Sequence, residues 1–86
     1  MSTLFARLSK VIIAQLGVDP EAVVPAARFT EDLDADSIEL LELVMAVEEE
    51  FSSPTRPIEI PDADMTKLKT VQDAANYLRD LGLEDS

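Results

Sequence analysis

The spacing of apolar residues constrains the fold of this 86-residue chain more than any other feature. In three segments, apolar side chains recur at steps of three and four residues, which places them on one face of an α-helix. The first segment runs from about Thr3 to Leu16, and the residue that follows it, Gly17, is a common helix stop. The pattern therefore predicts an all-α fold.

The central segment, from Asp36 to Phe51, is nearly free of helix breakers. Asp36 and Glu39 match a capping box, in which two side chains bond the backbone N–H groups at the start of a helix. One helical stripe is expected to face the core: Leu40, Leu43, Val44, Val47 and Phe51. A different face carries Ser37, Leu41, Met45 and Glu48. The segment thus predicts a central helix whose second face is not needed for the core.

A third segment, from about Val71 to Leu81, follows a second capping-box match at Thr70 and Asp73 and ends at Gly82. A shorter helix is expected to begin with Pro61, because proline is favoured at the first helical position. Three main helices and one short helix predict a small four-helix bundle, which forms one domain over residues 1–86.

The connecting segments lack sustained helical spacing. Asp19–Glu21 is expected to form a turn or one short helical turn, and Ser52–Pro57 is expected to form a polar turn. Ile58–Ile60 lies between two prolines and reads as an extended piece that touches the core. Residues 22–33 predict a long loop, pinned to the core by four side chains: Val23, Val24, Phe29 and Leu33.

The charge of the chain excludes several classes of partner. Eighteen acidic residues stand against seven basic ones, and the resulting net charge of −11 repels nucleic acids and anionic membranes. Partners with basic patches are favoured, because complementary potentials speed their encounter. No apolar run approaches the ~20 residues that span a bilayer. We therefore expect a cytoplasmic protein without membrane insertion, and we expect it to be a monomer.

The absence of cysteine and histidine excludes further classes. Disulfides and thiolate nucleophiles require cysteine, the usual zinc sites require one or both residues, and histidine is the commonest general base. We therefore expect neither a stand-alone hydrolase nor a specific metal site.

Ser37 lies in a window from Glu31 to Glu50 that holds nine acidic residues and no basic one. On the simplest interpretation, Asp36 and Ser37 only cap the central helix, and the carboxylates form a solvated face. The chain would then be an acidic interaction or cation-binding module. A second interpretation makes Ser37 the site of a covalent phosphodiester, which the N-terminus of a helix would stabilise. The residues alone leave both interpretations open.

Two other interpretations of this window fit less well. Asp32, Asp34 and Asp36 alternate like the first ligands of an EF-hand loop. However, Ser37 stands where that loop needs glycine and Leu43 where it needs glutamate, so only loose binding of divalent cations is plausible. A nucleophilic serine would need a neighbouring base, and the sequence has neither histidine nor a Gly-x-Ser-x-Gly elbow.

The segments Glu31–Ile38 and Glu42–Phe51 resemble the attachment segment of bacterial acyl carrier proteins. The resemblance extends to Leu16–Val18, Ile60–Asp62 and Thr70–Ala74, and so covers nearly the whole chain. It implies a four-helix bundle that is a carrier for fatty acid synthesis and not an enzyme. It also implies that a serine, here Ser37 flanked by Asp36, receives 4'-phosphopantetheine from coenzyme A and carries acyl chains as thioesters.

The implied partners are a phosphopantetheinyl transferase (a holo-acyl-carrier-protein synthase) and the acyl transferases, ketosynthases, reductases and dehydratases of fatty acid or related synthesis. Spacing along the central helix predicts the docking surface for these enzymes: Ile38, Leu41, Glu42, Met45 and Glu48. Exposed charges at Glu42 and Glu48 are expected to serve partners with little effect on folding. We also expect Met45 to be at least partly exposed.

An acyl chain needs shielding from water, and a helical bundle can offer an apolar space between its helices. The candidate walls of such a cavity are Leu43, Val47, Ile60, Leu68 and Tyr77. The same side chains also suit an ordinary core.

Two departures from the family pattern leave the pathway open. Asp34 stands where the fatty-acid type usually has glycine, which removes a residue free to adopt a positive φ. The segment Ser52–Pro57 makes the loop after Phe51 longer than usual and adds Arg56 near an acidic face. A specialised carrier for polyketide, unusual-lipid or other secondary metabolism is therefore the alternative.

Overall fold

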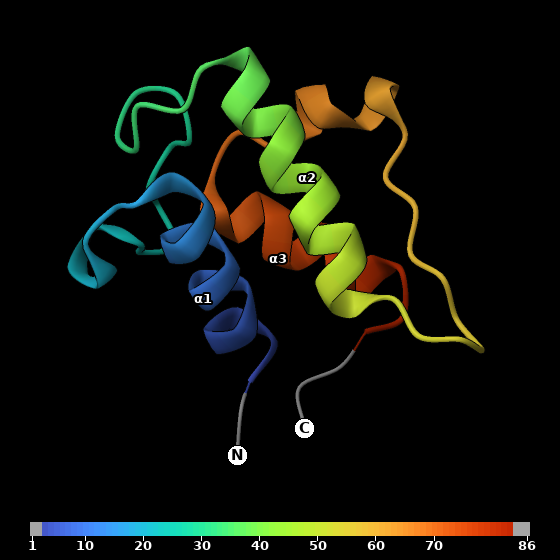
Figure 1. Cartoon of the computed structure of the whole chain (residues 1–86). Helices are drawn as coiled ribbons and strands as arrows, with labels where there is room; N and C mark the ends of the chain where they lie inside the picture. Colours follow the sequence, from blue (N-terminus) through green and yellow to red (C-terminus); the bar gives the residue numbers. More distant parts are fainter. Residues whose placement is uncertain (1–2, 84–86) are drawn as a thin grey trace.

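The computed structural model describes residues 3–83 (Figure 1). Three α-helices, α1 (Leu4–Leu16), α2 (Ser37–Phe51) and α3 (Val71–Asp80), alternate with two short 3₁₀ helices, η1 (Pro20–Ala22) and η2 (Asp62–Lys67). No strand occurs in this part of the chain. The prediction of an all-α bundle with three main helices is confirmed, and no helix in the described part is long and apolar enough to cross a membrane.

The α1 helix ends at Leu16 as its sequence predicts and begins at Leu4, one residue after the expected start, with Thr3 as its N-cap. The Thr3 hydroxyl accepts a hydrogen bond from the Ala6 N–H at 3.0 Å, which satisfies one of the unpaired donors of the first turn. At the other end, Gly17 adopts a left-handed φ of 65° and donates its N–H to the Ile13 carbonyl. The buried face of α1 consists of Leu4, Leu8 and Ile12.

The α2 helix packs against α1 and supplies the centre of the core. Its buried side chains are Leu43, Val44, Val47 and Phe51, as the apolar stripe predicts. Leu40 belongs to the same stripe but is only half-buried. The segment after α2 also follows expectation: Ile58 and Ile60 are buried, and Glu59 between them is exposed.

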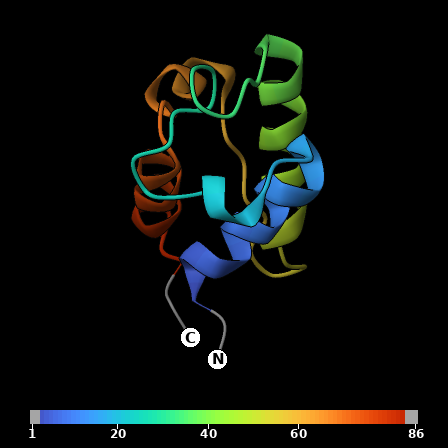
Figure 2. The ribbon, with the colours of Figure 1, turned by 90° about the vertical axis from the view of Figure 1, so that its left-hand side faces the viewer.

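The long loop between α1 and α2 crosses toward α3 and returns to the start of α2 (Figure 2). Backbone hydrogen bonds of 3.0 Å from Phe29 N–H to the Lys69 carbonyl, and from Val71 N–H to the Ala27 carbonyl, attach it to the start of α3. Val23, Phe29 and Leu33 are buried as predicted.

The expectation that Val24 pins this loop is wrong, because Val24 is 47% exposed. Its carbonyl accepts the Ala27 N–H, so the chain turns at this point. Ala27, which is 4% exposed, occupies the core position instead.

The short helix before α3 differs from expectation in two respects. It is a 3₁₀ helix over Asp62–Lys67, and Pro61 is its N-cap, one position before the expected one. The Asp64 N–H bonds the Pro61 carbonyl with the i to i+3 spacing of a 3₁₀ turn. The α3 helix then follows its prediction: Thr70 and Asp73 form a capping box, and the helix ends at Asp80, one residue before the expected Leu81.

The lengthened loop after α2 is attached to the far end of α3. The Arg56 guanidinium donates a hydrogen bond of 2.6 Å to the Leu81 carbonyl, at the C-terminal end of a helix where cations are favoured. The adjacent Gly82 has a φ of 98°, and a Cβ atom placed on it would lie 1.9 Å from Arg56 Nη2. Only glycine therefore fits at position 82 without moving the arginine.

We expect Gly82→Ala to lower the free energy of unfolding by about 1 to 2 kcal/mol, because it imposes a positive φ on alanine and displaces Arg56. Urea unfolding of the single and double variants with Arg56→Ala measures the coupling between the two positions. Gly17→Ala is the matched control, since its φ is also positive but its Cβ would meet nothing within 4 Å. If Gly82→Ala lowers the free energy of unfolding by the same amount with and without Arg56→Ala, the close approach of Arg56 does not contribute to the loss of stability.

Candidate functional site

Ser37 is the first residue of α2, and its hydroxyl is exposed. The helix start is held by the residues around it: Asp36 Oδ1 accepts the Glu39 N–H at 2.8 Å, and Glu39 Oε1 accepts the Asp36 N–H at 3.3 Å. The capping box predicted from sequence is thus present. Because Asp36 performs the capping, the Ser37 hydroxyl is left without a hydrogen-bond partner among residues 3–83.

Two backbone donors point to the kind of group that suits this position. Within the described chain, the N–H groups of Ser37 and Ile38 have no acceptor, as is usual in the first turn of a helix. These donors and the positive end of the helix dipole favour an anion. The carboxylates of Asp34 and Asp36 oppose one. A hydroxyl with free donors beside it fits a phosphodiester linkage, whereas no cluster of acidic residues in the described part is arranged to hold a metal ion.

The loop that leads into α2 is held by buried residues on both sides of Asp34. Leu33 and Ala35 are buried, and the Ala35 N–H bonds the Phe29 carbonyl at 2.8 Å. Asp34 between them has a φ of 55° and is the one non-glycine residue of the described chain with a positive φ. Aspartate at this position therefore does not remove the positive φ that glycine would allow. Asp34 adopts the left-handed conformation itself, which aspartate tolerates better than most residues.

An apolar patch extends from Ser37 along the exposed face of α2. Ile38 is 67% exposed, Leu41 43% and Met45 59%, and Glu42 is exposed beside them. The prediction that Met45 is at least partly exposed is confirmed. We refer to Ile38, Leu41 and Met45 as the α2 patch. Large apolar side chains are costly to leave in water, so a contiguous patch of them is typical of an interaction site.

Glu48 differs from the free surface charge that its helical position suggests. Its side chain is half-buried, and Oε2 accepts the backbone N–H of Ile60 at 2.9 Å. The carboxylate therefore attaches the extended segment Ile58–Ile60 to α2. The expectation that Glu48 is a freely exposed charge is wrong. Its small effect on folding stays a prediction, and the bond to Ile60 argues against it. One feature of the sequence could have indicated this contact. An extended segment such as Ile58–Ile60 has no strand partner, so its backbone N–H groups need acceptors from side chains elsewhere in the chain.

The five residues named as candidate cavity walls do come together. Leu43, Val47, Ile60, Leu68 and Tyr77 surround one void of about 20 Å³, which has room for roughly one water molecule. Their use as an acyl site stays a prediction.

A polar contact lies at the edge of this void. The Tyr77 hydroxyl donates a hydrogen bond of 2.5 Å to Asp64 Oδ2, which fastens η2 to α3. This bond raises the pKa of Tyr77 to about 12, and the same bond lowers the pKa of Asp64.

Comparison with known proteins gives one consistent result. Residues 6–78 match the family described as "Phosphopantetheine attachment site". The chain is 53% identical over 76 residues to an acyl carrier protein of Bdellovibrio bacteriovorus, covering 88% of this chain and 91% of that protein. It is 48% identical over 77 residues to an acyl carrier protein of Thermosynechococcus vestitus, covering 90% and 89% of the two chains.

Replacing Asp34 by glycine should relieve the backbone at its positive φ. We expect Asp34→Gly to raise the free energy of unfolding by about 0.5 to 1 kcal/mol. Asp34→Asn is the control, because asparagine removes the charge while keeping a side chain that tolerates the left-handed region. Thermal or urea unfolding of both variants separates the two effects. Equal gains from glycine and asparagine would contradict a backbone contribution and leave charge repulsion as the cause.

Proposed function

Since this chain belongs to the acyl carrier proteins, which carry acyl groups on a covalently attached 4'-phosphopantetheine, we propose that Ser37 is the residue that bears the arm. The observation that carries this proposal is the exposed hydroxyl at the first position of α2, which makes no hydrogen bond within residues 3–83. Acyl carrier proteins are carriers and not enzymes. Here we propose that the chain is the substrate of the enzymes that modify and use it.

Each residue around Ser37 has a distinct part in this proposal. The Asp36–Glu39 capping box fixes the start of α2 and keeps the hydroxyl at the surface, where a transferase can reach it. The free N–H groups of Ser37 and Ile38 stabilise the phosphodiester oxygens and offset part of the repulsion from Asp34 and Asp36. The chain has no cysteine and therefore no thiol of its own. The arm supplies the thiol that forms the thioesters.

Members of the family interact with a phosphopantetheinyl transferase and with the enzymes of synthesis, and we assign this contact to the α2 patch. Ile38, Leu41 and Met45 would form its apolar centre, and Glu42 would form part of its acidic rim. Methionine adapts its shape to different partners, which suits a surface that several enzymes must use. The net charge of −11 favours partners with basic patches and fast, salt-sensitive encounters.

We further propose that the acyl groups belong to fatty acid synthesis, the usual role of the family. A specialised carrier is the alternative, and two features favour it: Asp34 beside Ser37, and the loop Ser52–Pro57 held to α3 by Arg56. Both features leave the attachment position and the α2 patch intact.

The proposal predicts that incubation with coenzyme A and a broad-specificity phosphopantetheinyl transferase adds the mass of one phosphopantetheine group. Ser37→Ala should abolish the gain completely, while Ser53→Ala, at an exposed serine just after the other end of α2, should leave it unchanged. Mass spectrometry provides the measurement. No gain on the native chain would refute the carrier proposal. On protein from native cells, saturated acyl chains support the fatty-acid role, and other acyl groups support the alternative.

The two acidic residues of the predicted docking surface should respond differently to charge reversal. We expect Glu42→Lys to slow arm addition at low salt by about three- to tenfold without changing stability, because an exposed charge acts mainly on encounter. Glu48→Lys should also lower the free energy of unfolding by about 1 to 2 kcal/mol, because the Ile60 N–H loses its acceptor. Transferase kinetics at two salt concentrations and urea unfolding measure both effects. Wild-type kinetics for Glu42→Lys at low salt would contradict the acidic rim.

A further inference from the structure

The space inside the bundle and the groove on its surface differ greatly in size. The interior void of about 20 Å³ has room for one water molecule. A surface groove of about 590 Å³ lies between the loop Arg28–Glu31, η2 and the start of α3. That volume is within the range of small-molecule binding sites. Leu40 forms part of its wall and follows Ser37 by three residues on α2, so the groove lies about one helical turn from the attachment position.

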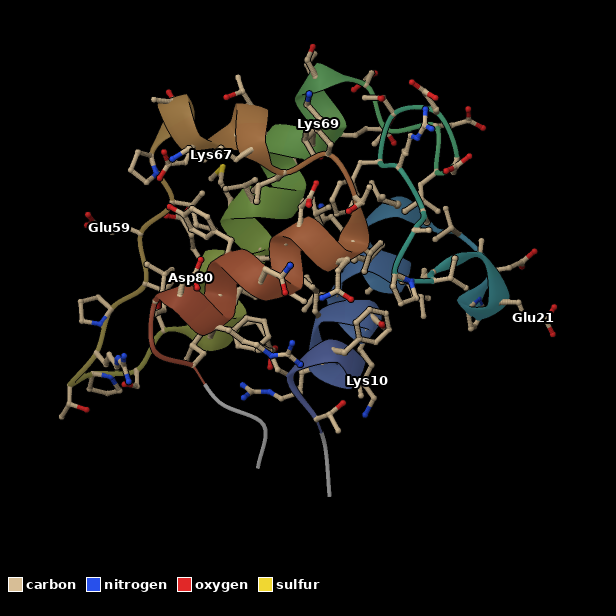
Figure 3. The ribbon with its side chains drawn as sticks, turned by 180° about the vertical axis from the view of Figure 1, so that it is seen from behind. Lys10, Glu21, Glu59, Lys67, Lys69 and Asp80 are labelled. Carbon is tan, nitrogen blue, oxygen red and sulfur yellow. The ribbon has the colours of Figure 1, made fainter. Side chains whose placement is uncertain are left out.

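The groove combines an apolar wall with a rim of two basic and two acidic side chains: Arg28, Lys69, Glu31 and Asp73. Leu40 and Met65 are half-buried and pack against the core, so their outer surfaces offer contact to an aliphatic chain. Lys69 lines the groove and is exposed, and its ammonium has no ion-pair partner within residues 3–83. Figure 3 shows Lys69 close to Lys67, which is paired with Asp64.

One of the two carboxylates on the groove is paired with a cation, and the other accepts backbone hydrogen bonds. Glu31 pairs with Arg28 across one turn of the loop. Asp73 Oδ2 accepts the Thr70 N–H at 3.1 Å as part of the capping box of α3. The Lys69 N–H also bonds Asp73 Oδ2, at 3.3 Å, and no cation pairs with this carboxylate within residues 3–83. The charged side chains of the groove therefore sum to zero, and the ammonium of Lys69 is the cation among them without an ion pair.

We propose that this groove holds the carboxylate end of a dicarboxylic acyl group carried on the Ser37 arm, and that Lys69 selects for that carboxylate. The inference rests on the proposed function. Most of a surface with a net charge of −11 repels an anionic acyl end, so an unpaired cation beside an apolar wall is the favourable place for it. A chain that ends in a methyl group gains nothing from Lys69.

The test compares two acyl groups of equal length on the same arm. Coenzyme A thioesters of hexanoate and of adipate are loaded with the broad-specificity transferase, and mass spectrometry verifies loading. Backbone amide shifts of Met65 and Thr66, which both line the groove, report its occupation by NMR. Both samples carry the same arm and phosphate, so a difference between their amide shifts reports the effect of the terminal carboxylate alone. We expect adipyl to populate the groove about two- to fivefold more than hexanoyl, as an exposed ion pair allows, and high salt to reduce the difference.

Two lysine variants complete the design. Lys69→Gln should abolish the difference between the acyl groups. Lys10→Gln should preserve it, because Lys10 is likewise exposed and without an ion pair among residues 3–83 but lines a different groove between α1 and α2. Figure 3 shows the two lysines at opposite ends of the molecule.

Equal shifts for both acyl groups, equal effects of the two lysine variants, or shifts confined to residues around the interior void would overturn the inference. A chain that takes up no arm fails at the mass-spectrometry step. That result refutes the proposed function as well, so the two failures are distinguishable.

Discussion

The reciprocal hydrogen bonds between Asp36 and Glu39 set the residue at which α2 begins. Successive side chains on the helix point about 100° apart, so Ser37 at the first position lies on the same side as Leu41, four residues later. The apolar stripe places Val44 and Val47 in the core and leaves Leu41 and Met45 at the surface. The position of Ser37 follows from the same pair of bonds, because an aspartate that caps the helix leaves the next hydroxyl unused.

Much of the fold could be predicted because it depends on residues close together in sequence. Capping boxes at Asp36 and Thr70, the helix stop at Gly17 and apolar stripes of period 3.6 locate the three main helices to within a residue or two. The proline at position 61 indicated a short helix but not its 3₁₀ form, since that choice depends on how η2 meets α3. The position of Ser37 in the site was likewise visible, although its role came from a resemblance and not from spacing.

Other features depend on contacts between distant segments, and periodicity carries no information about those. The acceptor role of Glu48 requires that the chain near Ile60 passes beside α2, and the exposure of Val24 reflects a turn closed by Ala27. Asp34 differs again, because its positive φ is imposed by buried neighbours on both sides. Burying Leu33 and Ala35 offsets the cost of that conformation.

The contact of Arg56 with Leu81 joins the C-terminal ends of α2 and α3 through one loop. In Figure 1, η2 and the start of α2 lie at the other end of this pair of helices. The loop that departs from the family pattern therefore acts on the end of the bundle opposite the attachment residue.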